Sequence, residues 1–287
     1  MKNLEFTKMH GIGNDYIFID ATRSVPNGIP ALAKKLSDRH FGIGSDGLVL
    51  ICPSQKADFM MDMYNADGSR GLMCGNAIRC VAKYVYERGL TDKKTLVIET
   101  LSGLKTLELS VQNGCVSQVT VHMGTPVLET SRIPVRWNDH QMIDEPIAVA
   151  GRLYRLTCVS MGNPHAVTFT DNLDTLDLTS LGPAFEYHSL FPDRVNVEFV
   201  QILDRHNLRM RVWERGAGET LACGTGACAA LVAAVLTNRA DNKAVVHLRG
   251  GDLSIEWNKK TDEVIMTGPA EFVFDGWITL EEEDDLC

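Results

Sequence analysis

The sequence is short of positive charge, and this shortage excludes one large class of partners. Its 287 residues include 28 lysines and arginines against 37 aspartates and glutamates, which gives a net charge of −9 and a pI of about 5.4. A protein that binds nucleic acid needs a basic stripe to neutralise phosphates, and we find none here. We therefore expect no nucleic acid among its partners.

Long apolar runs are also missing. No stretch approaches the roughly 18 apolar residues of a membrane span, and the opening MKNLEFTKMH lacks the apolar segment of a signal peptide. These absences predict a cytoplasmic protein without a membrane partner. The composition, 45% hydrophobic and 23% charged, is that of a folded globular protein whose length suits two medium-sized domains.

Disulfide bonds are not expected, although the sequence contains eight cysteines. The reducing cytoplasm favours free thiols, so each cysteine needs its own interpretation. Cys52, Cys115 and Cys158 lie in apolar or strand-like segments, and we predict that all three are small buried residues.

An internal repeat relates the two halves of the chain. Gly13-Asn14 recurs as Gly162-Asn163 and Cys74-Gly75 recurs as Cys223-Gly224; the offsets 163 − 14 and 223 − 74 both equal 149. Matches that keep one offset and one order over such a distance indicate two copies of one structural unit.

Each copy places its cysteine at the predicted start of a helix. Helices are predicted over residues 76–89 and 226–239, and the second is apolar nearly all round, as a helix inside a domain would be. Short alternating strands fill most of the remaining chain. We therefore predict an α+β protein of two pseudo-symmetric domains, each a mixed or antiparallel sheet or barrel wrapped around a central helix, with the active site in the cleft between them.

Domain boundaries follow from glycine and proline punctuation near residue 124. The first domain is predicted to comprise residues 1–124 together with a returning C-terminal strand, 272–287. The second is predicted to comprise residues 125–271.

A thiol at a helix start faces unpaired backbone N–H groups and the positive end of the helix dipole. Both favour the thiolate and lower its pKa, so such a cysteine can act as a base. The same N–H groups form an anion site of the right size for a carboxylate, supplied here by Gly75-Asn76 and by Gly224-Thr225.

Inversion of an amino-acid α-carbon needs a base on one face and an acid on the other, with the carboxylate held to stabilise the carbanion. Cys74 and Cys223, on opposite sides of one α-carbon, would meet this requirement, one as thiolate and one as thiol. The duplication favours this interpretation over a structural role for either cysteine alone.

Other roles for the cysteines are less favoured. The intervals from Cys74 to Cys80 and from Cys223 to Cys228 do not match a zinc knuckle, so no metal is expected. A redox pair is a second alternative. Cys80 and Cys228 lie within their helices, are not related by the repeat, and are predicted to be packing residues.

The segments YNADGSRGLMCGNAIRC and WERGAGETLACGTGACA resemble the diaminopimelate epimerase family. The resemblance extends to KMHGIGNDYIFID, RHFGIGSDGLVL, MGNPHAV, RVNVEFVQI and GPAEFVFDG, so it spans the whole chain. It implies a pyridoxal-phosphate-independent enzyme of lysine and peptidoglycan precursor synthesis, which interconverts LL- and meso-2,6-diaminopimelate without a cofactor. Proline racemases and phenazine-type isomerases share a similar double-domain fold but differ in these motifs.

The resemblance also assigns site residues. Cys74 and Cys223 are implied to be the acid/base pair, with His165 and Glu214 as helpers beside them. The implied substrate-binding residues are Asn14, Asn65, Gly75, Asn76, Asn163, Asn196, Glu214, Arg215, Gly224 and Thr225.

Physical chemistry gives these residues plausible roles. The end of the substrate that is not epimerised must be gripped, and Arg215 is suited to clamp its carboxylate. The amides of Asn65 and Asn196 can donate to the same carboxylate or accept from an ammonium group. Taken singly, Asn163 before a proline reads as a turn residue and Glu214-Arg215 as a solvated surface pair.

Gly47 departs from the family pattern, because many relatives carry a substrate-contacting glutamine there. The side-chain contact is absent in this chain, and Gly47 is left out of the predicted site.

A racemase of another amino acid such as proline is the nearest rival, and a non-enzymatic thiol redox or metal-binding protein is the rival from another class. A small substrate would leave Arg215 without a distal carboxylate to bind. Relatives commonly form homodimers through a segment that resembles the one around Phe274, so a homodimer is expected.

Overall fold

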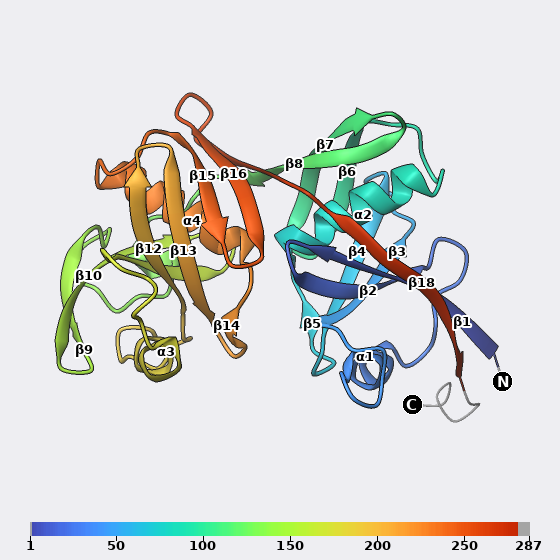
Figure 1. The fold of residues 1–287 in the computed structure, drawn as a ribbon, viewed down its shortest axis with the longest axis horizontal. Coiled ribbons are helices and arrows are strands. Elements are labelled where there is room, and N and C mark those ends of the chain that lie inside the picture. Colours follow the sequence, from blue (N-terminus) through green and yellow to red (C-terminus); the bar gives the residue numbers. More distant parts are fainter. Residues whose placement is uncertain (1, 281–287) are drawn as a thin grey trace. The chain divides into compact units, whose positions relative to one another are not determined.

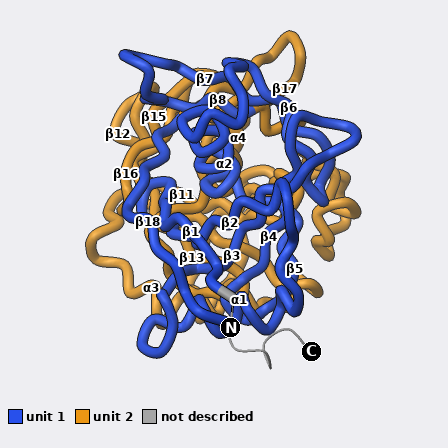
Figure 2. The backbone as a smooth tube through the Cα atoms, turned by 90° about the vertical axis from the view of Figure 1, so that its right-hand side faces the viewer, with its two compact units in different colours: residues 1–121, 268–287 blue, residues 122–267 orange. Residues whose placement is uncertain are grey.

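The computed structural model describes residues 2–280 and divides the chain into two compact units (Figure 2). The first unit comprises residues 1–121 and 268–287, and the second comprises residues 122–267. The predicted domain boundary after Gly124 falls at the end of strand β8, on the second unit's side of this division. Part of the predicted C-terminal strand, residues 281–287, lies outside the described residues.

The first unit is drawn mostly in blue to green in Figure 1, and its last described strand, β18 (Glu271–Leu280), is drawn in red. Its helices are α1 (Ile29–Ser37) and α2 (Gly75–Glu87). Its strands are β1 (Lys2–Gly11), β2 (Asn14–Asp20), β3 (Gly47–Cys52), β4 (Phe59–Asn65), β5 (Arg70–Gly71), β6 (Thr95–Thr100), β7 (Gly103–Gln112), β8 (Cys115–Gly124) and β18 (Glu271–Leu280).

The second unit repeats this arrangement. Its helices are α3 (Leu178–Glu186) and α4 (Gly224–Leu236), with a short 3-10 helix, η1, at Thr130–Arg132. Its strands are β9 (Glu145–Val149), β10 (Arg152–Ser160), β11 (Pro164–Phe169), β12 (Asn196–Asp204), β13 (Asn207–Glu214), β14 (Gly218–Thr220), β15 (Lys243–Leu248), β16 (Gly251–Asn258) and β17 (Glu263–Gly268).

The sequence repeat is also a structural repeat. Helices α1 and α3, and helices α2 and α4, have bounds that differ by the same 149 residues found in the sequence (178 − 29 and 224 − 75). Parallel pairing of β2 with β3 in one unit corresponds to parallel pairing of β11 with β12 in the other. The mixed, largely antiparallel α+β fold predicted from the sequence is therefore the observed one.

A buried helix lies at the centre of each unit. Helix α4 is built from Gly, Ala, Val and Leu with one cysteine, and nearly all of its residues are buried. Helix α2 is more mixed, and its long cations are buried along their stems: Lys83 donates to the carbonyl of Val116 at 2.7 Å, and Arg79 donates to the carbonyl of Pro269 at 3.0 Å. None of the helices within residues 2–280 has the length and apolarity needed to cross a membrane.

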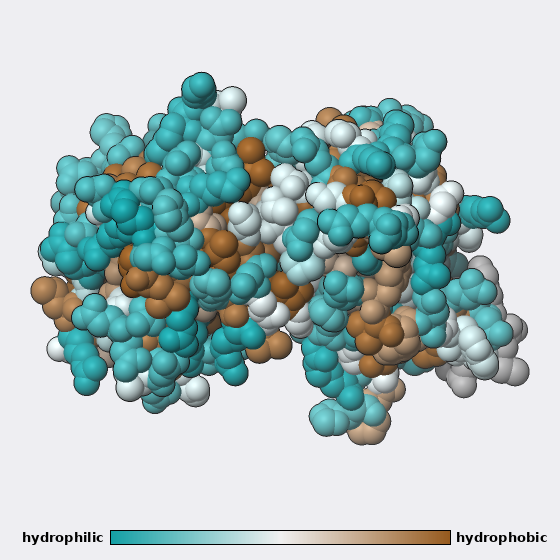
Figure 3. Space-filling model, turned by 45° about the horizontal axis from the view of Figure 1, so that its top comes forward, coloured by the Kyte–Doolittle hydropathy of each residue, from teal (hydrophilic) through white to brown (hydrophobic). Residues whose placement is uncertain are grey.

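Strand β18 joins the first unit through a long antiparallel pairing with β1. The Phe274 ring meets the Phe6 ring edge-on, with centroids 5.9 Å apart. A Cβ atom on Gly276 would lie 2.6 Å from the tip of the Phe6 ring, so a side chain at this position would displace that ring. The face of the molecule in Figure 3 is mostly hydrophilic, with apolar residues in separate areas.

The predicted burial of the outlying cysteines is partly wrong. Cys158 is buried as predicted, but Cys52 is only half-buried and Cys115 is exposed. Cys115 opens β8 directly after the Asn113-Gly114 turn, where the strand faces solvent. Cys80 and Cys228 are buried inside α2 and α4, as expected of packing residues.

Candidate active site

Cys74 caps the N-terminus of α2. Its backbone is extended (φ −134°, ψ 119°), and its Sγ accepts a hydrogen bond from the backbone N–H of Ala77 at 3.5 Å. The thiol in turn donates to Oδ1 of Asn14, 3.3 Å away. The half-buried thiol therefore lies at the positive end of the helix, where the first N–H groups remain available to an anion.

Asn14 links Cys74 to a charged cluster on the neighbouring loop. Its Nδ2 donates to Oδ2 of Asp46 at 2.7 Å, while Asn76 donates to its Oδ1 at 3.2 Å. Arg39 bridges Asp46 and Asp15 through Nη2 at 2.9 and 2.7 Å. The predicted residues Asn14, Cys74 and Asn76 thus form one connected group.

Asn65 ends β4, where its register brings it opposite Gly47 on β3. Its Nδ2 donates to the Ser69 hydroxyl at 2.9 Å, and the residue is exposed. A Cβ atom on Gly47 would lie 2.1 Å from the Tyr64 carbonyl oxygen and 2.9 Å from the Tyr16 ring. The local backbone therefore has no room for a side chain at Gly47, where the family resemblance implies glutamine in many relatives.

Cys223 caps α4 with the same geometry as Cys74 (φ −125°, ψ 110°). Its Sγ accepts from the backbone N–H of Gly226 at 3.3 Å and lies 3.5 Å from the Thr225 hydroxyl. Unlike Cys74, this thiol is buried, with 5% of its residue surface exposed. The two predicted cysteines therefore occupy equivalent helix caps in different degrees of burial.

The expectation of a lowered thiol pKa is wrong for Cys223. Burial raises its pKa well above the ordinary value, and the carboxylates of Glu214 and Glu198 raise it further. The hydrogen bonds from Thr225 and Gly226 act in the opposite direction but are outweighed. Cys223 is therefore a thiol, and a potential acid, at neutral pH.

Glu198 is a site residue that the sequence reasoning missed. It lies on β12 beside His165 on β11, and its Oε1 is 2.7 Å from His165 Nδ1, with both side chains fully buried. His165 Nε2 is 3.0 Å from Oδ1 of Asn163. Alternation along RVNVEF places Glu198 on the face opposite Val195 and Val197, which predicts an exposed side chain, so the sequence held no signal for its burial; both faces of β12 are in fact buried.

Asn196 opens β12 and is engaged by the protein at both ends of its amide. Its Nδ2 donates to the Pro164 carbonyl at 2.8 Å, and its Oδ1 accepts from the backbone N–H of Arg215 at 2.9 Å. Arg215 itself is exposed and donates through Nη1 to the Asp193 carbonyl at 3.0 Å. Glu214, at the end of β13, accepts from the Thr220 hydroxyl. Asn196 thus fixes the backbone that carries Arg215.

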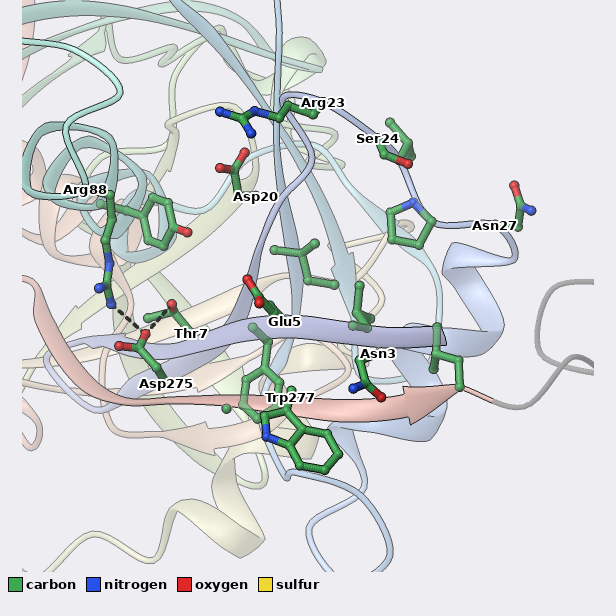
Figure 4. Close-up of a pocket in the computed structure, with 18 residues that line it drawn as sticks. Asn3, Glu5, Thr7, Asp20, Arg23, Ser24, Asn27, Arg88, Asp275 and Trp277 are labelled. Atoms are coloured by element: carbon green, nitrogen blue, oxygen red, sulfur yellow. Dashed lines mark hydrogen bonds and ion pairs between the residues drawn. The ribbon is translucent and has the colours of Figure 1, made fainter. Parts of the chain in front are cut away.

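A separate hollow of about 900 Å³ lies in the first unit and includes none of the predicted site residues. It is lined by parts of β1, β18 and the loop after β2 (Figure 4). In Figure 4 the Asp275 carboxylate accepts from both Thr7 and Arg88, at 2.6 and 2.5 Å, which ties β18 to β1 and α2. These two contacts of Asp275 help to hold the C-terminal strand β18 in the first unit.

Comparison with known proteins decides the family. A family model described as diaminopimelate epimerase matches residues 6–129 and 157–273. The chain belongs to the diaminopimelate epimerase family. It is accordingly an isomerase of the epimerase type, as the sequence resemblance implied.

Relatives in this family match the chain along nearly all of its length. A diaminopimelate epimerase of Acetivibrio thermocellus is 56% identical over 279 residues, covering 97% of this chain and 100% of the relative. One from Methanococcus maripaludis is 56% identical over 277 residues, with 96% and 100% covered. Both are named for the same substrate that the motifs indicate.

Solved structures show the same fold at much lower identity. A probable proline racemase from Agrobacterium radiobacter is 15% identical with a TM-score of 0.70, covering 97% of this chain and 93% of its own. A phenazine biosynthesis protein from Bacillus anthracis is 14% identical with a TM-score of 0.69, covering 98% and 100%. The diaminopimelate epimerase family thus shares its fold with other enzyme families.

The effect of the Glu214 charge on the pKa of Cys223 can be tested directly. The Glu214→Gln variant removes one negative charge that raises the Cys223 pKa, so that pKa should fall. A larger thiolate fraction at pH 8 should then speed alkylation of Cys223 by iodoacetamide about three- to tenfold. Peptide mass spectrometry measures the labelling of Cys223 separately from the other cysteines.

Glu256→Gln is the matched control, because that carboxylate is neutralised by Lys243 at 3.0 Å on the β15–β16 hairpin. It should leave labelling of Cys223 unchanged. Equal labelling rates in the wild type and Glu214→Gln would mean that Glu214 does not control the thiol.

Proposed function

We propose that this protein interconverts LL- and meso-diaminopimelate by moving protons through Cys74 and Cys223, without a cofactor. The observation that carries the proposal is the duplicated cap: each unit places one thiol at the N-terminus of a buried helix, with the same backbone geometry. Membership of the diaminopimelate epimerase family supplies the substrate.

The proton balance of the reaction is simple. The thiolate of one cysteine removes the α-hydrogen as a proton, so the C–H bond breaks, an S–H bond forms and the electron pair stays on the substrate. The thiol of the other cysteine then gives its proton to the opposite face of the α-carbon and becomes the thiolate. The enzyme ends with the two roles exchanged, ready for the reverse reaction.

Charge that develops on the carbanion spreads into the adjacent carboxylate. We place that carboxylate at the helix starts, against the backbone N–H groups of Gly75-Asn76 and Gly224-Thr225. Helix N-termini stabilise anions through aligned dipoles and unpaired donors, and the glycine in each pair keeps the backbone accessible. This stabilisation grows as the negative charge grows, which is what lowers a barrier.

The distal end of the substrate is held by the remaining predicted residues. Arg215, exposed and oriented by Asn196, is assigned to the distal carboxylate, and Asn65 is assigned as a donor to the same group. Asn14, Asn163 and Glu214 complete the contacts with the amino and carboxylate groups of the substrate. His165 orients Asn163 through a hydrogen bond between its Nε2 and Oδ1 of Asn163, which are 3.0 Å apart.

Substrate charge also explains how a buried thiol can become a base. Glu214 and Glu198 hold the Cys223 pKa high, but the ammonium group of a bound amino acid opposes these carboxylates and favours the thiolate. Ionisation of Cys223 is thereby linked to the presence of the substrate.

Cytoplasmic location and a homodimer belong to the same proposal. The mechanism needs reduced thiols, and these are the form that a reducing compartment maintains. None of the cysteines within residues 2–280 takes part in a disulfide bond. Strand β18 exposes Val273, Phe274 and Trp277, with 66% of Trp277 accessible, and such an apolar edge suits a second copy.

Sedimentation velocity tests the dimer. The 31.7 kDa chain should sediment with twice that mass, and a Trp277→Lys, Phe274→Lys double variant should sediment as a monomer because charge is costly in an apolar interface. A wild-type protein that sediments as a monomer throughout the micromolar range would contradict the dimer.

Serine variants test the assignment of the cysteines. Serine caps a helix well, so Cys74→Ser and Cys223→Ser should keep the fold, but a hydroxyl is a far weaker acid than a thiol. Each variant should lose about 10²- to 10⁴-fold in kcat, measured by a coupled assay for meso-diaminopimelate formed from the LL isomer. Circular dichroism checks the fold, and Cys115→Ser, at the exposed cysteine, serves as the control with normal activity.

Full activity in either serine variant would exclude the assigned pair. Turnover of L-proline in place of diaminopimelate would instead favour the rival racemase.

A further inference from the structure

Asp46 has no role in the mechanism above, yet it is the residue that holds Asn14. Its Oδ2 accepts from Asn14 Nδ2 at 2.7 Å and from the backbone N–H of Asp15 at 3.1 Å. Asp46 pairs with Arg39 as an ionised carboxylate, and an ionised carboxylate has no proton to donate, so toward Asn14 it can only accept. The amide of Asn14 must therefore turn its NH₂ group toward Asp46.

This constraint fixes what Asn14 offers to Cys74. With its NH₂ group bound to Asp46, Asn14 presents its carbonyl oxygen to the thiol, 3.3 Å away. A carbonyl oxygen accepts a hydrogen bond from S–H but repels a thiolate. The chain from Asp46 through Asn14 thus favours the protonated form of Cys74.

In the second unit, the equivalent asparagine is bound through its carbonyl oxygen and not through its NH₂ group. Asn163 corresponds to Asn14 in the repeat (163 − 149 = 14), but its Oδ1 faces His165 Nε2 at 3.0 Å. The position equivalent to Asp46 is Val195 (46 + 149), which is buried and cannot accept a hydrogen bond from an amide. The carboxylate that holds the NH₂ group of the asparagine is therefore a feature of the first unit.

We propose that Asp46 is a positioning residue: it holds Asn14 with its carbonyl toward Cys74 and so keeps Cys74 as the proton donor of the resting enzyme. The part of the proposal that concerns turnover rests on the proposed function; the part that concerns the thiol does not. The charged groups around Asn14 are Asp15, Arg39 and Lys8, which pair with one another or with Asp46.

The test compares three variants of the charged cluster. Asp46→Ala removes the acceptor for the Asn14 NH₂ group and leaves the weaker hydrogen bond from Asn76, at 3.2 Å, to orient the amide. Asp46→Asn removes the charge but keeps an oxygen that can accept from Asn14. Arg39→Ala removes the salt bridges but leaves the Asp46–Asn14 hydrogen bond. Asp46 is 40% exposed at its side chain, so these changes spare the core.

Cys74 is alkylated with iodoacetamide at pH values from 6 to 10, and peptide mass spectrometry measures the labelling rate at each pH. This gives the ionisation midpoint of the Cys74 thiol without any substrate. Loss of one S–H hydrogen bond should lower the midpoint pH of labelling in Asp46→Ala by about 0.3 to 1 unit, a two- to tenfold faster reaction below the midpoint. Asp46→Asn and Arg39→Ala should keep the wild-type midpoint. The midpoint separates ionisation from access, because access changes only the plateau rate.

A second variant removes the Asn14 carbonyl oxygen itself. Asn14→Ala should lower the midpoint as Asp46→Ala does, and the double variant should add nothing further, since both act through one carbonyl. This comparison also keeps the proposal testable if Asp46→Ala proves unstable.

Kinetics give the functional arm. Asp46→Ala should lose about tenfold in kcat with LL-diaminopimelate, while Asp46→Asn should stay within about twofold of the wild type. If the wild type does not turn over diaminopimelate, the proposed function fails, and the alkylation arm still decides the role of Asp46. An unchanged midpoint in Asp46→Ala, an equal shift in Asp46→Asn, or additive shifts in the double variant would each overturn the proposal.

Discussion

The hydrogen bond from the third backbone N–H of a helix to a capping sulfur is the interaction on which the site depends. In each unit it fixes a thiol at the N-terminus of a buried helix. The Sγ–N distance is 3.5 Å from Cys74 to Ala77 and 3.3 Å from Cys223 to Gly226. The same cap leaves the neighbouring N–H groups for a carboxylate. One local arrangement therefore supplies both the acid or base and the anion site, and duplication of the unit supplies the pair.

Duplication has not kept the two halves alike. His165 and Glu198 form a fully buried polar pair in the second unit, where the repeat gives Tyr16 and Val49 in the first (165 − 149 and 198 − 149). A Cβ atom on Gly226 would lie 2.6 Å from Glu198 Oε1, and that position is Ala77 in the first unit. Buried ionisable pairs are poor sources of stability. Stability therefore does not account for this pair, which is one of the differences between the two units.

Much of this arrangement was predictable from the sequence, because the repeat offset and the alternating strands are local patterns. The two central helices, the cysteines at their starts and the α+β class all followed from such patterns. Helices α1 and α3 were not predicted, because each has only nine residues and shows too little periodicity to identify a helix. In addition, α1 begins after a left-handed Gly28 that provides no side-chain cap. The raised pKa of Cys223 was also missed, because it comes from burial and from carboxylates on other strands.

Transfer of protons between two thiols is the central claim, and the most direct test is the fate of the α-hydrogen in deuterium oxide. A thiolate that removes the proton keeps it, while the opposite thiol delivers deuterium acquired from the solvent. At early times of the reaction from the LL isomer, meso-diaminopimelate should therefore carry one α-deuterium while the recovered LL isomer carries none. Product that retains its α-hydrogen, or substrate that gains deuterium as fast as product forms, would contradict the account.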